Sequence, residues 1–306
     1  MSTRDDPAPR SDNPPVHSRS GSVLTFSPPH GACDCHCHIF GGNDRYASVL
    51  PDGYSLPVGP LESYLEMAGR LGFERRVFVQ PVTYGADSSC ILDALRALGA
   101  DTSRGIGGIP EDKVSDATLS EWHHLGLRGV RVNYTPYKPY EAGFTEAILP
   151  DIERAAALVR ELGWMLDVMT PNWLTMELLP HLERMRVPFT LGHFGKLPAS
   201  KGVDHSDFQR LLSHIRDGEG RFWMKLCAAY QVSEEPGYAD VAPLAQALYE
   251  AAPERVIWGT DWPHIRHEAE GDAAALLNLF ASWFPDSTDR RQILTVNPAR
   301  LFGFVD

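Results

Sequence analysis

The stretch ACDCHCHIFG, residues 32–41, is a short apolar run in which polar side chains occupy alternate positions. Such alternation predicts a β-strand, because successive side chains of a strand point to opposite faces. Asp34, His36 and His38 are therefore expected on one face. The cysteines of the run fall on the other face: Cys33, Cys35 and Cys37. Two histidines at i and i+2 can converge on one reacting atom or metal ion, or merely hydrogen-bond within a half-buried strand, and the rest of the chain decides which.

Strand-like and helix-like segments alternate from this stretch to the end of the chain. Segments such as 147–162, 204–217 and 239–252 carry apolar residues at three- and four-residue spacing, as amphipathic helices do. The strand-like runs, each closing on a polar or small residue, are 32–38, 75–80, 105–109, 127–133, 165–169, 187–193, 222–226 and 256–261. Eight strands alternating with helices predict an α/β fold, the (β/α)₈ TIM barrel. A doubly wound sheet is the alternative, but no G-x-G-x-x-G fingerprint follows a predicted strand.

The domain organisation predicted from length and composition is one barrel preceded by a tail. The 306 residues suit a single barrel, which we place at residues 31–306. Residues 1–30 are rich in Pro, Ser, Asp and Arg and lack the apolar core of a signal peptide, so a disordered N-terminal tail is expected. The segments 41–60, 134–146 and 228–238 would be long loops over the mouth of the barrel.

The charge balance and the cysteines limit the kinds of partner. The chain has 28 Lys plus Arg against 40 Asp plus Glu, a net charge of −12, which argues against a nucleic-acid partner. It contains no apolar run of about 20 residues, so no membrane partner is expected. Its five cysteines are an odd number, typical of free thiols in a reducing cytoplasm, where those of residues 33–37 would pack against the outer helices. These features leave the oligomeric state undetermined.

Catalytic groups of such barrels lie at the carboxyl ends of the strands. Asp261 stands in WGTDWPH, residues 258–264, where an apolar strand ends in a carboxylate before a proline turn. An N-cap aspartate is the ordinary alternative. The groups at the other predicted strand ends are His36, His38, Gln80, Arg131, Asn133, Met169, His193 and Lys225. A carboxylate facing imidazoles can act as a general base, and N–H donors can stabilise an oxyanion, so a shared catalytic site is favoured.

Six stretches in order carry a resemblance to a known family. They are DCHCHIFG (34–41), VQ (79–80), RGVRVN (128–133), GHFG (192–195), WGTDWPH (258–264) and NPARLF (297–302). With these, residues 32–304 resemble the amidohydrolase superfamily, in particular the branch of 2-pyrone-4,6-dicarboxylate lactonase and the sugar-lactone hydrolases and isomerases. The resemblance implies an amidohydrolase-type barrel and a lactone hydrolase. In that family the aspartate matching Asp261 takes a proton from the water that attacks the ester. The histidines matching His36, His38 and His193 polarise its carbonyl oxygen.

The same four residues are also the predicted metal ligands. His36, His38, His193 and Asp261 could together hold one divalent ion, with Zn²⁺ as the first choice. Most of the superfamily is metal-dependent, whereas the lactonases that this chain resembles work without a metal. Met169 stands where two-metal members place a histidine, and strand 127–133 offers no lysine or glutamate to bridge two ions. We therefore expect either no required cofactor or a single divalent cation, and no nucleotide.

The predicted substrate is a small anionic lactone or carboxylate. A dicarboxylate calls for two sets of cationic donors. Arg131 and Lys196 would bind one anionic group, Lys196 standing where the resembled lactonase has an arginine. The segment CAAYQ, residues 227–231, lacks the arginine expected for the second. The substrate-binding residues expected in all are Gln80, Arg131, Asn133, Lys196, Lys225, Tyr230 and His264, whereas His267 has no matching partner in the strand-end pattern.

Other functions share part of this pattern. A lactone isomerase would use the same base and polarised carbonyl for proton transfer. A Zn-dependent decarboxylase of aromatic or enoic acids shares the late histidine and aspartate, but that branch usually has a glutamate before its first histidine, where this chain has Asp34. A non-catalytic ligand-binding barrel is disfavoured by the complete set of strand-end histidines and aspartate.

Overall fold

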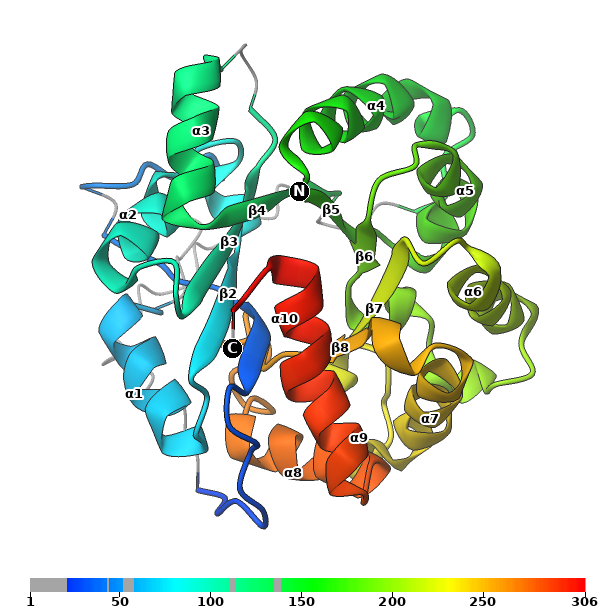
Figure 1. Cartoon of the computed structure of the whole chain (residues 1–306). Coiled ribbons are helices and arrows are strands. Elements are labelled where there is room, and N and C mark those ends of the chain that lie inside the picture. Colours follow the sequence, from blue (N-terminus) through cyan, green and yellow to red (C-terminus); the bar gives the residue numbers. More distant parts are fainter. Residues whose placement is uncertain (1–20, 43, 52–57, 111–113, 135–138, 306) are drawn as a thin grey trace, which may run out of the picture.

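The computed structural model describes residues 21–42, 44–51, 58–110, 114–134 and 139–305. Its parallel strands follow one another in chain order around a nearly closed barrel, with helices outside (Figure 1). The predicted (β/α)₈ barrel is thus confirmed. The strands are β1 Cys33–Cys37, β2 Arg75–Val79, β3 Ser103–Gly108, β4 Leu127–Asn133, β5 Met165–Met169, β6 Phe189–Leu191, β7 Phe222–Leu226 and β8 Val256–Trp258.

The last and first strands meet through the segment after β8. The N–H of Asp261 donates to the carbonyl of His36 at 2.8 Å, and the N–H of His38 donates to that of Trp262 at 2.7 Å. Gly259 permits this approach, because a Cβ there would lie 2.5 Å from the backbone nitrogen of His36. The closure brings the motif at residues 34–41 beside the one at residues 258–264, far away in the sequence.

The helices form where apolar residues recur on one side. In α6, Phe208, Leu211 and Ile215 are buried at three- and four-residue spacing, and the side chain of His205 accepts the N–H of Asp207 at the amino end. The helices are α1 Leu61–Leu71, α2 Ser89–Leu98, α3 Asp116–Leu125, α4 Phe144–Leu162, α5 Asn172–Arg184, α6 Ser206–Asp217, α7 Ala242–Ala251, α8 Ala273–Trp283, α9 Ser287–Arg291 and α10 Asn297–Phe302. No helix of the described ranges is long and apolar enough to cross a membrane.

The end of the barrel opposite the catalytic motifs is closed by the C-terminal segment. In Figure 1, α10 lies across the ring of strands. Phe302 and Phe304 join the interior cluster, which also contains Cys33, Cys35, Val77, Val79, Ile106, Met165, Trp223 and Ile257. Arg104 fastens the segment by donating to the carbonyls of Phe302 at 2.9 Å and Gly303 at 2.6 Å. Only the carboxyl ends of the strands are therefore left for a site.

The strict alternation predicted for β1 is wrong. Asp34 pairs with Arg76 and Cys37 with Phe78, so three steps on β1 face two on β2, as in a β-bulge. Asp34 consequently turns from the histidines towards α1, where Tyr64 donates to its Oδ2 at 3.2 Å. The prediction that the three cysteines pack against the outer helices is wrong for Cys33 and Cys35, which pack inside the barrel. Cys37 alone of the three joins the cluster that contains Tyr64 of α1. All five cysteines are free and buried.

The predicted N-terminal tail is described only from residue 21, since residues 1–20 lie outside the described ranges. Both the N–H and the hydroxyl of Thr25 donate to Oδ1 of Asn278 in α8, at 2.8 and 2.9 Å. Residues 21–30 thus have at least one fixed contact with the barrel.

Candidate active site

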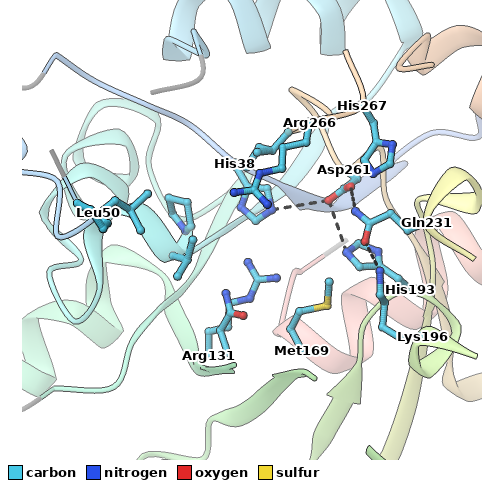
Figure 2. Close-up of a pocket in the computed structure, with 15 residues that line it drawn as sticks. His38, Leu50, Arg131, Met169, His193, Lys196, Gln231, Asp261, Arg266 and His267 are labelled. Atoms are coloured by element: carbon cyan, nitrogen blue, oxygen red, sulfur yellow. Dashed lines mark hydrogen bonds and ion pairs between the residues drawn. The ribbon is translucent and has the colours of Figure 1, made fainter. Parts of the chain in front are cut away.

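A cavity of about 480 Å³ opens at the carboxyl ends of the strands. Asp261, His38 and His193 line it (Figure 2), and His36 lies directly behind them with no exposed surface. The structure therefore brings together the four residues predicted as catalytic, although they come from β1 and from the segments after β1, β6 and β8.

Asp261 is the centre of this group. Its Oδ1 lies 3.3 Å from Nε2 of His36 and 3.7 Å from Nε2 of both His38 and His193. Its Oδ2 accepts the hydroxyl of Tyr230 at 2.7 Å and the amide of Gln231 at 3.2 Å. One oxygen is therefore held by the segment after β7, while the other faces the imidazoles.

The backbone of Asp261 is also unusual. Its φ is +61°, and that of His193 is +50°, both in the left-handed region that costs a non-glycine residue about 1 kcal/mol or more. The hydrogen bond from Asp261 N–H to β1 keeps the residue in this conformation. Such strain is typical of functional sites, where the surrounding structure fixes a side chain in place.

Nδ1 of each imidazole, the nitrogen directed away from Asp261, has its own partner, which determines which ring nitrogen carries the proton. Nδ1 of His38 lies 2.7 Å from the carbonyl of Val79 and must donate, so Nε2 presents a lone pair. Nδ1 of His36 lies 3.2 Å from the ammonium of Lys225, which only donates, so the proton of this ring is on Nε2 and points at Asp261. Nδ1 of His193 lies 3.0 Å from the thiol of Cys227.

The electrostatics favour an ionised Asp261 carboxylate beside neutral His36 and His193 rings. Burial raises the pKa of Asp261, but the imidazoles around it, His193 first, outweigh burial and hold that pKa well below its usual range. Burial lowers the pKa of His193 to about 3. Burial and the nearby Lys225 ammonium hold the pKa of His36 well below its usual value. Asp261 is thus available as a base throughout the neutral range.

A buried ionic cluster lies beneath these histidines, and sequence reasoning missed its centre, Asp167. Lys225 Nζ lies 2.5 Å from Oδ1 of Asp167, and Arg131 Nε lies 3.4 Å from Oδ2. Thr190 donates to Oδ1 at 2.6 Å. Burial raises the pKa of Asp167, but the two cations outweigh it and lower that pKa. The available signal was a lone acidic residue inside the apolar strand MLDVM, residues 165–169.

The predicted substrate-binding residues divide into two groups. Three line the cavity: Arg131, Asn133 and Lys196. Lys196 donates to Oε1 of Gln231 at 2.6 Å, and burial lowers its pKa to about 8. The other four do not line it: Gln80, Lys225, Tyr230 and His264.

Those four instead support the site. The amide of Gln80 donates to the carbonyls of Gly85 and Asp87, at 3.1 and 2.7 Å. Lys225 is paired with Asp167 rather than facing the cavity. Nδ1 of His264 lies 3.1 Å from the hydroxyl of Tyr230, the group that donates to Asp261.

Three polar residues that line the cavity were not predicted as site residues: Gln231, Arg266 and His267. His267 has no partner in the strand-end pattern, yet its ring centroid lies 4.7 Å from that of Tyr230. The signal that could have found Arg266 and His267 is their place directly after the WGTDWPH motif, on the loop that follows the catalytic aspartate.

The predicted metal ligands can be tested against this geometry. Ligand atoms of His36, His38 and Asp261 all lie within 4.8 Å of one another, whereas His193 is not part of that group. Nε2 of His36 is buried without a hydrogen-bond partner. Two imidazoles and a carboxylate suit Zn²⁺, so the residues fit a single ion. The Lys225 ammonium at Nδ1 of His36 acts against it, because it places the ring proton on the nitrogen that would bind the metal.

Comparisons with known proteins identify the family of the chain and agree with the fold. A family model described as Amidohydrolase matches residues 33–304. The chain is 36% identical to 4-sulfomuconolactone hydrolase of Hydrogenophaga intermedia, over 92% of each chain. It is 28% identical to D-galactarolactone isomerase of Agrobacterium fabrum, over 94% of this chain and 96% of that one. A solved structure from Pseudomonas putida, described as a candidate 2-pyrone-4,6-dicarboxylic acid hydrolase, superposes with a TM-score of 0.75 at 28% identity, covering 90% of this chain and 98% of that one.

Proposed function

The chain belongs to the amidohydrolase family, and from this premise we propose that it hydrolyses a small lactone that carries an anionic group. The observation that carries the proposal is the Asp261 carboxylate, with one oxygen held by Tyr230 and the other facing three imidazole nitrogens. The similarity to a sulfomuconolactone hydrolase supports a lactone as the bond that is hydrolysed.

The proposed reaction uses these groups in turn. A water molecule near Oδ1 of Asp261 is oriented by the lone pair of His38 and attacks the lactone carbonyl carbon as Asp261 takes its proton. The developing oxyanion is stabilised by Nε2–H of His193, with the thiol of Cys227 donating to Nδ1 of the same ring. The ring C–O bond then breaks, and Asp261 returns the proton to the leaving oxygen. The product is the open hydroxy acid.

The anionic group of the substrate would be bound by the cationic wall of the cavity. Lys196 and Arg131 line it. Arg131 is fixed by Asp167 and by donation from Nη1 to the carbonyl of Gln80 at 2.8 Å. A fixed guanidinium recognises a carboxylate or sulfonate with little loss of side-chain entropy.

A divalent ion, where bound, would be held by His36, His38 and Asp261 and would polarise the lactone carbonyl as a Lewis acid. The contact between Lys225 and His36 supports hydrolysis by the protein's own groups. Metal analysis of the purified protein, with activity before and after chelation, separates the two cases: full activity in metal-free protein supports hydrolysis by the protein's own groups.

The free cysteines support a reducing, cytoplasmic location.

The test is a panel of lactones with and without a carboxylate or sulfonate, assayed with the wild type and Asp261→Asn. The variant should lose about 10²- to 10⁴-fold in kcat, the usual contribution of a positioned base, and remain folded. Asp217→Asn, on the exposed side of α6, is the matched control and should keep full activity. Undiminished ring opening by Asp261→Asn would disprove the mechanism.

Lactone isomerisation is the second candidate, favoured by the similarity to a galactarolactone isomerase. The same base could move a proton or relay an acyl shift while the ring is retained. Hydrolysis in ¹⁸O-labelled water places one label in the product carboxylate, whereas an isomerase product contains none. The label therefore decides between the two reactions.

A further inference from the structure

A buried carboxylate that the proposed reaction does not use lies where the segment after β8 meets β1. Asp34 stands two residues before His36, and neither Asp34 nor Thr260 has exposed surface. Oδ1 of Asp34 accepts the N–H of Thr260 at 2.9 Å and that of His36 at 3.2 Å. A buried carboxylate is costly unless hydrogen bonds compensate for the water it has lost. Its donors here come from both motifs, so Asp34 fixes the one relative to the other.

The hydroxyl of Thr260 extends this contact across the proposed base. It donates to Oδ2 of Asp34 at 2.7 Å and accepts the N–H of Trp262 at 3.1 Å. The second of these bonds spans Asp261, because it links the residue before it to the residue after it, as in the turns that Ser and Thr hydroxyls stabilise. A hydroxyl donates one proton and accepts others on its lone pairs, so both bonds form together.

The turn spanned in this way is the strained part of the site. The φ of Asp261 is +61°, a left-handed conformation that a residue with a Cβ keeps only where its surroundings fix it. Its own N–H donates to the carbonyl of His36, and the Thr260 hydroxyl fixes the residues on either side. Rotation of Asp261 out of this conformation would carry its Oδ1 away from Nε2 of His36, 3.3 Å distant. The geometry of the proposed base therefore depends on the turn.

We propose that Asp34 and Thr260 are positioning residues: the Asp34 carboxylate orients the Thr260 hydroxyl, which fixes the turn at Asp261 so that Oδ1 faces the histidines. The proposal rests on the function proposed above, in which Asp261 is the base. Because the hydroxyl fixes the group that accepts the proton and does not line the cavity, its loss should lower kcat and leave KM almost unchanged.

The chain offers a matched control for this role. Tyr64 of α1 donates to the same Oδ2 of Asp34, at 3.2 Å, and is also fully buried. Its hydroxyl ties Asp34 to α1 and not to the turn at Asp261. Thr260→Val and Tyr64→Phe thus each remove one hydroxyl donor from one carboxylate oxygen with little change of side-chain shape. A carboxylate that only stabilises the fold would respond alike to both substitutions.

The first test measures kcat and KM with a lactone that the wild type opens, together with the melting temperature of each variant. Thr260→Val should lower kcat about ten- to hundredfold with KM within about threefold, the cost of a reacting group misplaced by up to about 1 Å. Thr260→Ser keeps the hydroxyl and should restore kcat to within about threefold of the wild type. Tyr64→Phe should leave kcat within about threefold of the wild type, although its melting temperature falls by a similar amount to that of Thr260→Val. Equal losses of kcat in Thr260→Val and Tyr64→Phe, or no loss in Thr260→Val, would overturn the proposal.

A second variant covers the case in which Thr260→Val does not fold. Asp34→Asn retains an Oδ1 that accepts the two N–H groups, but its amide nitrogen cannot accept the Thr260 hydroxyl. Its kcat should fall by about tenfold or more, again with KM within about threefold. An unchanged kcat in Asp34→Asn would overturn the role of the carboxylate.

The closing test separates this proposal from the function on which it rests. In the background of Asp261→Asn, Thr260→Val should lower the residual rate by less than about threefold, because the hydroxyl acts through the carboxylate that is already gone. A full ten- to hundredfold loss in both backgrounds would disprove the positioning role and retain Asp261 as the base. A crystal structure of Thr260→Val needs no activity: Oδ1 of Asp261 should lie farther from Nε2 of His36 than 3.3 Å, and an unchanged turn would overturn the proposal. A displaced Asp261 in that structure, together with full activity in Asp261→Asn, would retain the positioning of the side chain and disprove its function as the base.

Discussion

Asp167→Asn should be the most informative single substitution beneath the active site. The Asp167 carboxylate contacts Lys225 Nζ at 2.5 Å, Arg131 Nε at 3.4 Å and the Thr190 hydroxyl at 2.6 Å. The side chain of Lys225 has no exposed surface, and that of Asp167 has 1%. An asparagine keeps the volume but removes the charge, so two buried cations lose the carboxylate they share.

The size of the effect follows from that burial. Removing one partner of a buried, hydrogen-bonded ion pair costs about 3–5 kcal/mol, because the remaining charge stays out of water without compensation. At roughly 2–4 °C per kcal/mol for a chain of this size, the melting temperature should fall by roughly 6–20 °C. The loss is larger than that expected from a surface pair, about 0–1 kcal/mol.

The assay is thermal unfolding followed by circular dichroism, with a double-mutant cycle. Lys225→Met alone should also destabilise, since it leaves Asp167 with Arg131 only, whereas Asp167→Asn with Lys225→Met should cost less than the sum of the two. The coupling expected for such neighbours is about 0.5–3 kcal/mol. Strictly additive losses, or a loss below about 1 kcal/mol in Asp167→Asn, would refute the ion-pair reasoning. Asp217→Asn is the surface control.

Three further outcomes are expected. Tyr230→Phe removes the donor to Oδ2 of Asp261, so kcat should fall about tenfold with an unchanged melting temperature, and an unchanged kcat would refute the positioning role. Because burial lowers the pKa of Lys196 to about 8, its charge is present below that pH and lost above it; KM for an anionic lactone should rise above pH 8 in the wild type, and not in Lys196→Arg. Asp34 accepts the N–H and hydroxyl of Thr260 and the hydroxyl of Tyr64, so Asp34→Asn should lower the free energy of unfolding in urea by about 1–3 kcal/mol. An unchanged free energy of unfolding would contradict a stabilising role for these hydrogen bonds.

The sequence determined the barrel and the principal residues of the site. The strand-like and helix-like periods are local properties, and the carboxyl end of a barrel strand is where functional groups gather, so His36, His38, His193 and Asp261 could be selected without a structure. Their meeting around Oδ1 of Asp261 agrees with that selection. Their catalytic and metal-binding roles stay predictions.

Tertiary structure decided what depends on register and on neighbours far away in the chain. The bulge in β1 follows from its pairing with β2, so alternation alone placed Asp34, Cys33 and Cys35 on the wrong faces. Lys225 was predicted to bind the substrate, but it pairs with Asp167 of β5, a neighbour that the local sequence around Lys225 does not reveal. Long-range pairing of this kind leaves no period in the sequence, because a charge inside a barrel is fixed by its neighbours in space.

The ten residues 32–41 show both what the sequence determines and what only the tertiary structure decides. Its sequence alone indicated a β-strand with two histidines on one face, since alternation and apolar composition are read residue by residue. Which nitrogen of each histidine carries the proton was decided by Val79, Lys225 and the folded barrel that brings them there. A proton's position depends on hydrogen-bond partners within about 3 Å, and only the tertiary structure supplies those partners.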